Sequence, residues 1–160
     1  MAGSARMEQR RLTDKQMLLE NLTNRGATPA LVNTLSFAEA RHRMLAENIA
    51  NWQTPGYKSK QLDARAFQKA LRRALDEKGR DAKKPFVVAG SGQFRSGPDG
   101  RLHVTPEVQP VANVLFHDGT NASIERMMSD LAGNAMMYQA ASTILKGYYD
   151  GMRKAIRGTL

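Results

Sequence analysis

The chain has 160 residues, 6% of them aromatic, which suits one domain with a modest core. It carries a net charge of +9 and no cysteine, so disulfides, Cys-ligated metals and thiol nucleophiles are excluded. The polar N-terminus lacks the apolar stretch of a cleaved signal peptide, and no apolar run approaches the ~18 residues of a membrane helix. These features predict a soluble, cytoplasmic protein, although an export route without a cleaved signal would leave no trace in them.

The first segment, residues 1–27, is predicted to be an N-terminal extension that is partly mobile. Thr13–Gln16 has the form of a capping box, and the apolar residues that follow could support a short helix ending before Gly26. Those apolar residues are Met17, Leu18 and Leu22.

The second segment, residues 28–57, is predicted to hold a long helix and a turn. Thr28 and Pro29 have the form of an N-cap followed by the first helical residue. Apolar or small residues then recur with a period of about 3.5, which is typical of a coiled-coil seam. The seam positions are Leu31, Leu35, Ala38, His42, Leu45 and Ile49. His42 has no second ligand one turn away, so we expect a packed or interfacial side chain there and no metal site.

The helix is predicted to end at Asn51, which tolerates a left-handed conformation. Pro55 and Gly56 then form the preferred central pair of a type II turn, because proline presets its φ and glycine accepts a positive φ.

The third segment, residues 58–120, is basic and rich in glycine and proline. Between Tyr57 and Lys84 there are ten Lys and Arg residues against four acidic ones. Asp63–Glu77 is predicted to form a short helix, with short strands after Pro85 and a turn at Pro98–Gly100. Val108–Phe116 is expected to be extended. The apolar face of the short helix would consist of Phe67, Ala70, Leu71 and Ala74.

The fourth segment, residues 121–160, is predicted to be a long helix capped at Ser123. Its seam alternates steps of four and three residues without interruption, which predicts coiled packing against another helix. The seam runs Ile124, Met128, Leu131, Ala135, Tyr138, Ser142, Leu145, Tyr149, Met152 and Ile156, flanked by Met127, Asn134, Ala141 and Tyr148. The predicted fold is therefore mainly α, with N- and C-terminal amphipathic helices pairing as a coiled coil around a small, irregular, strand-containing insert.

Chemistry-bearing residues form no recognisable site. His42, His103 and His117 lie on three different predicted elements, and Gly90–Gly92 lacks the third glycine of a dinucleotide fingerprint. Carboxylates are scattered and serines show no nucleophile pattern. We therefore expect no enzyme, metal or cofactor. The basic charge keeps a nucleic-acid-binding module open as an alternative, although no recognition motif accompanies it.

The stretch "AENIANWQTPGYK", Ala46 to Lys58, resembles the N-terminal signature of the bacterial flagellar axial proteins, the rod and hook family. We call the following residues the assembly signature: Asn48, Ile49, Ala50, Asn51, Thr54, Pro55, Gly56, Tyr57 and Lys58. Asn134 to Gly158 is similar to the C-terminal helix of that family, and within it the chain most resembles proximal rod subunits. Another rod subunit, such as FlgC, is the alternative within the family. Trp52 stands where the family usually has a small residue.

The resemblance implies a structural subunit of the proximal rod of the flagellar basal body. Such subunits self-assemble into a helical tube that transmits torque and forms the export channel. Implied partners are further copies, rod proteins of the FlgC, FlgF and FlgG types, the FliE adaptor between MS ring and rod, the export-gate proteins and, during secretion, the type III export apparatus. Neither nucleic acid nor a membrane span is implied. The implied location is the periplasmic rod, reached without a cleaved signal peptide.

Overall fold

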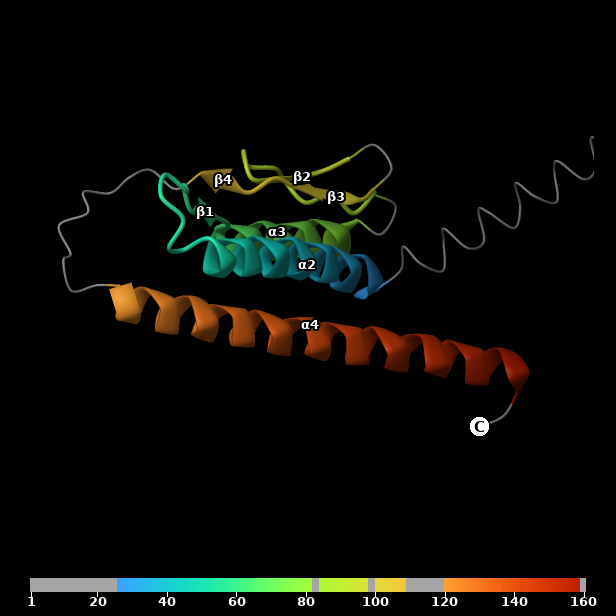
Figure 1. Cartoon of the computed structure of the whole chain (residues 1–160). Helices are drawn as coiled ribbons and strands as arrows, with labels where there is room; N and C mark the ends of the chain where they lie inside the picture. Colours follow the sequence, from blue (N-terminus) through green and yellow to red (C-terminus); the bar gives the residue numbers. More distant parts are fainter. Residues whose placement is uncertain (1–25, 82–83, 98–99, 109–119, 159–160) are drawn as a thin grey trace, which may run out of the picture.

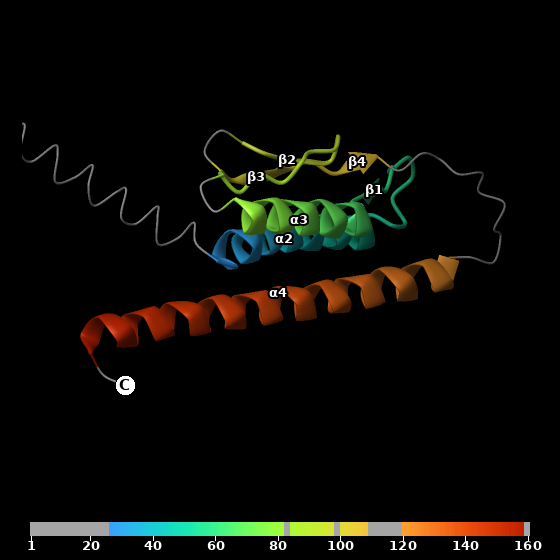
Figure 2. The ribbon, with the colours of Figure 1, turned by 180° about the vertical axis from the view of Figure 1, so that it is seen from behind.

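A computed structural model describes residues 26–81, 84–97, 100–108 and 120–158, excepting the side chains of 120–123. Two helices, α2 (Thr28–Ala50) and α4 (Thr120–Arg157), run antiparallel and contact each other along α2 (Figure 1). Helix α3 (Ala64–Arg80) and the strands lie on the other side of α2 (Figure 2). The predicted fold class, terminal helices around a small strand-containing insert, is confirmed.

The core between α2 and the insert is built on phenylalanines. The Phe37 and Phe67 rings stack with centroids 4.0 Å apart, and Phe94 meets both rings edge-on. All three side chains are buried, as is Phe86. Such aromatic pairs contribute about 0.5–1.5 kcal/mol each beyond burial of their area. The chain has few aromatics, but concentrating four of its five phenylalanines here gives the insert a core of its own.

The described part of the insert holds two small antiparallel ladders. Strand β2 (Phe94–Ser96) pairs with β3 (Leu102–Val104), as expected for a hairpin around Gly100, whose φ is +74°. Strand β1 (Lys60–Gln61) pairs with β4 (Glu107–Val108), which closes the insert into a loop. The predicted face of α3 is confirmed: Phe67, Ala70 and Ala74 are buried and Leu71 packs against the same cluster.

Several predicted boundaries are wrong. Thr28 is the first helical residue of α2, and Ala27, without a side-chain cap, takes the N-cap position. Helix α2 does end with Asn51 at its C-cap, as predicted, but Asn51 is not left-handed: its φ is −107°, and its side-chain amide caps the Glu47 carbonyl. Helix α4 begins at Thr120, which places Ser123 inside the first turn. The predicted helix before Gly26 and the extended segment beyond Val108 lie outside the described residues.

Candidate functional site

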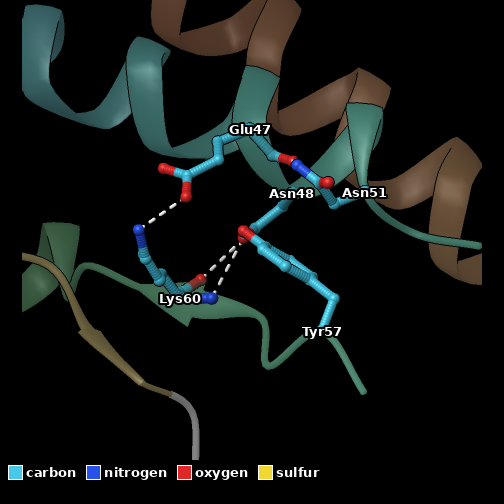
Figure 3. Close-up of polar contacts among 5 residues, drawn as sticks. All are labelled: Glu47, Asn48, Asn51, Tyr57 and Lys60. Atoms are coloured by element: carbon cyan, nitrogen blue, oxygen red, sulfur yellow. Dashed lines mark hydrogen bonds and ion pairs between the residues drawn. The ribbon is translucent and has the colours of Figure 1, made fainter. Parts of the chain in front are cut away.

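The end of α2 is clasped to the chain that leaves the turn by one buried side chain, Asn48. Its amide nitrogen donates to the Lys60 carbonyl at 2.7 Å, and its amide oxygen accepts from the Lys60 N–H at 3.0 Å (Figure 3). The amide thus satisfies both backbone groups of Lys60 as a neighbouring strand would. The same oxygen accepts from the Tyr57 hydroxyl at 2.9 Å. We call Asn48, Tyr57 and Lys60 the Asn48 clasp.

An ion pair closes the clasp on the solvent side. The Lys60 ammonium lies 2.6 Å from a Glu47 carboxylate oxygen, and this bond raises the pKa of Lys60 above its ordinary 10.5. Partial burial, assisted by the Glu47 charge, raises the pKa of the Tyr57 phenol above 10.0. Both shifts favour the forms that donate within the clasp, protonated lysine and neutral phenol.

The turn between Asn48 and Lys60 has the predicted geometry. The Tyr57 N–H donates to the Thr54 carbonyl at 3.1 Å, and Gly56 between them has a φ of +78°. Pro55 and Gly56 therefore occupy the central positions of a type II turn. Asn51 prepares the turn, because its side-chain amide donates to the Glu47 carbonyl at 2.9 Å and its own carbonyl accepts from Thr54 N–H.

The remaining residues of the assembly signature are more open to solvent. Ile49 is half-buried, whereas Ala50, Thr54 and Lys58 are exposed. Trp52 is half-buried at the end of the helix. The assembly signature therefore divides into two sets. The inward residues form the turn and the Asn48 clasp, and the outward residues lie exposed on the surface at the end of α2.

Two specific contacts set the register between α2 and α4. The Asn134 side chain is buried and its amide donates to the Ala38 carbonyl at 2.8 Å. One turn further along, Arg41 forms an ion pair of 3.1 Å with Asp130. Asn134 and Ala38 also line an apolar groove between the two helices, together with His42 and Tyr138.

The predicted seam residues are distributed over more than one face. Ala38 and Leu45 are buried, and eight are half-buried: Leu31, Leu35, Ile49, Ile124, Leu131, Leu145, Tyr149 and Met152. Six are exposed: His42, Met128, Ala135, Tyr138, Ser142 and Ile156. On α4 the buried positions, Asn134 and Ala141, come from the flanking set. Helix α4 therefore turns one face to α2 and leaves an apolar stripe beside it in solvent.

Sequence reasoning missed Phe37, Glu47 and Lys60. Phe37 lies off the 3.5-residue seam because it faces the insert, so a helix that packs on two sides needs two stripes. Lys60 bonds to Asn48 through its backbone N–H and carbonyl, and no side-chain pattern reveals such a role; its ammonium also pairs with Glu47, thirteen residues away in the sequence. Its position five residues beyond Pro55 was visible, but only the fold brings it to Asn48.

Within the described residues, no group of three His, Asp or Glu side chains is placed to hold a metal ion. None of the described helices is both long and apolar enough to cross a membrane.

Comparison with known proteins gives a consistent result. The flagellar basal body rod protein FlgB of Salmonella typhimurium is 30% identical over 129 residues, covering 78% of this chain and 88% of that protein. This chain belongs to the FlgB family. The FlgB proteins of Yersinia ruckeri and Bacillus subtilis are 29% and 23% identical, over 94% and 95% of their lengths. No family model and no solved structure matches the chain. FlgB relatives are basal body rod proteins, and this membership does not favour the nucleic-acid alternative.

Proposed function

We propose that the chain is a structural, non-enzymatic subunit of the proximal rod, exported without a cleaved signal peptide and assembled in the periplasm into a helical tube. Its proposed neighbours are further copies of itself, FlgC-, FlgF- and FlgG-type rod proteins, the FliE adaptor and the export-gate proteins. Type III export would deliver it. Family membership supports the rod; the proximal position, location and neighbours are the proposal.

One observation carries the proposal: large apolar side chains lie exposed on α4. Met128, Met136 and Ile144 are 55%, 71% and 59% exposed, and Tyr138 is 46% exposed. Single exposed apolar residues are ordinary, but a run of them along one helix marks an interaction surface. A subunit whose longest helix exposes apolar side chains gains stability when neighbouring subunits cover them. Contacts between different faces of successive subunits build an open helical assembly, as a rod requires.

Met128→Asp tests this surface, with Ser129→Asp as the matched control. Both residues are exposed on α4, so either carboxylate costs the isolated fold little, within roughly 0.5 kcal/mol. If Met128 becomes buried between subunits, an unpaired carboxylate there costs several kcal/mol per interface. We expect Met128→Asp to be exported but absent from purified basal bodies, and Ser129→Asp to assemble. Normal rods containing Met128→Asp would refute the assignment of this surface.

The proposed domain limits and site residues can be tested in the same strain. The proposal assigns the helix pair 28–57 and 121–160 to the tube, residues 58–120 to an outer insert, and the assembly signature to the joint between them. Export and incorporation, scored separately for each variant, distinguish a folding defect from a lattice defect.

A further inference from the structure

Three segments that are distant in the sequence enclose a polar cleft beside the Asn48 clasp. The cleft has a volume of about 420 Å³ and lies between the second half of α2, strand β1 and the first turns of α4. Figures 1 and 2 both show the start of α4 at the same end of the molecule as β1 and the end of α2. Two clasp residues, Asn48 and Lys60, form part of its wall, and their hydrogen bonds hold that wall in place. We call this space the joint cleft.

Positive charge predominates in the joint cleft. Three cations line it against one carboxylate, a net formal charge of +2: Arg41, Lys60, Arg126 and Asp130. Arg41 already pairs with Asp130 at 3.1 Å, and Lys60 pairs with Glu47 at 2.6 Å. Arg126 is exposed and forms no ion pair with any of the described residues. The cleft therefore holds one cation without a counter-ion.

Arg41 also keeps an unused donor beside this cation. Its side chain is only 18% exposed, and Nη2 donates to the Asp130 carboxylate. The Nε–H of Arg41 is buried and has no acceptor. Buried donors without an acceptor are rare, and such a group commonly marks a place where an ion or ligand completes the structure. A turn of the guanidinium toward the cleft offers this donor to an oxyanion, which arginine binds with a pair of parallel hydrogen bonds.

We propose that the joint cleft binds the side-chain carboxylate of an Asp or Glu presented by a neighbouring rod subunit. The inference rests on the proposed function, which supplies the neighbour. One unpaired cation and one spare donor match the single charge of a carboxylate. The volume equals about one turn of a helix that is about 10–12 Å wide, so a side chain enters and the rest of the partner stays outside.

Charge also indicates which neighbour is favoured. The chain carries a net charge of +9, so a second copy brings like charge to a cleft that is already basic. A more acidic rod subunit approaches without that repulsion. The proposed occupant is therefore a carboxylate of a different rod subunit.

A matched pair of small probes tests the cleft in purified, unassembled chain. N-acetyl-glutamate α-amide carries the side-chain carboxylate, and N-acetyl-glutamine α-amide has the same shape without the charge. At constant ionic strength, the NMR signal of the Arg41 Nε–H is expected to shift with the glutamate probe only. Its dissociation constant should be on the order of 10 mM, because only one or two charge-assisted bonds form. No shift with glutamate, or an equal shift with both probes, would overturn the proposal, and tighter binding of inorganic phosphate would assign the cleft to a free anion instead.

Two variants separate binding in the cleft from general attraction to a basic protein. Arg126→Gln removes the unpaired cation of the cleft, whereas Lys69→Gln removes an exposed cation of α3, and both lower the net charge by one. Affinity for the glutamate probe is expected to fall about threefold in Arg126→Gln and to stay unchanged in Lys69→Gln. Equal affinities in the two variants would contradict the assignment.

The role in the rod is measured separately. Arg126→Glu is expected to be exported but to reach purified basal bodies at least about tenfold less than Lys69→Glu, because a carboxylate in the cleft repels the incoming one. Equal incorporation would overturn the assignment to a neighbouring subunit. Self-association of the purified wild-type chain that Arg126→Glu abolishes would assign the cleft to a second copy and overturn it as well. Absence of the wild-type chain from basal bodies would refute the proposed function, whereas the probe titration, which uses no rod, still decides whether the cleft binds a carboxylate.

Discussion

Replacing Asn48 with alanine tests the clasp most directly. The substitution removes three hydrogen bonds of 2.7, 3.0 and 2.9 Å and leaves the two backbone groups of Lys60 without their partner. The side chain is only 4% exposed, so water cannot fully replace it. The substitution also keeps the helix intact, because alanine has the highest helix propensity.

The expected cost follows from the count of bonds. A typical intramolecular hydrogen bond contributes about 0.5–1.5 kcal/mol net, so three bonds predict a loss of about 2–4 kcal/mol in the free energy of unfolding. Tyr57→Phe removes only the hydroxyl bond and is expected to cost about 1 kcal/mol. Asn51→Ala loses the bond to the Glu47 carbonyl at 2.9 Å and a long, exposed bond from the Thr54 hydroxyl at 3.4 Å. It is the control for helix capping and should cost a similar amount.

Urea unfolding of the two single variants and the double variant completes a double-mutant cycle. In the Asn48→Ala background the Tyr57 hydroxyl has already lost its acceptor, so adding Tyr57→Phe is expected to cost about 0–0.5 kcal/mol. Two results would refute the reasoning: a loss below about 1 kcal/mol for Asn48→Ala, or a full, additive cost of Tyr57→Phe in the double variant.

Two further predictions concern the turn and its ionisation. Gly56→Val is expected to lower the free energy of unfolding by about 2 kcal/mol. The cost comes from the φ of +78° alone, since a Cβ at Gly56 meets no atom within 4 Å. Gly79→Ala in α3, where a Cβ also meets nothing within 4 Å, should instead stabilise the fold by up to ~1 kcal/mol, and equal unfolding midpoints for the two variants would contradict this. The raised pKa values of Tyr57 and Lys60 mean that their contribution to stability is present below pH 10 and is lost as pH rises through them. Phenolate absorbance, taken as wild type minus Tyr57→Phe, should therefore show a midpoint above 10.0, and a midpoint at or below it would be inconsistent with the clasp.

The sequence predicted the terminal helices because their patterns are long and local. A 3.5-residue repeat over α2 and α4, a Pro-Gly turn and the apolar face of α3 each depend on neighbours within a few positions. The type II turn at Gly56 was predictable for the same reason: its conformation follows from two adjacent residues.

What the sequence left undetermined depends on contacts between distant segments. The face of α4 that meets α2 is one example. The 3.5-residue seam and its flanking set differ only by a small rotation of the helix, so the sequence pattern alone does not decide which of them packs on α2. Asn134 and Ala141, two flanking residues, are the buried ones among the predicted positions of α4. Likewise, no local pattern distinguishes Phe37, which stacks on Phe67 thirty residues away, from other apolar residues of α2.

The clasp joins the two halves of the architecture at a single residue. The backbone of Lys60 is hydrogen-bonded to the side chain of Asn48 in α2. Lys60 also belongs to β1, where its register partner is Val108 of β4. Val108 is the last described residue before the connection to α4. The loop formed by the insert therefore closes where α2 ends, and α4 returns along α2 from there. A connector without these hydrogen bonds would leave β1 free to change its position relative to the end of α2. Asn48, Tyr57 and the turn at Gly56 hold this closure, and the contacts of Phe37 with Phe67 and Phe94 hold the rest of the insert against α2. The clasp and the phenylalanine core therefore set the orientation of the insert relative to α2 together.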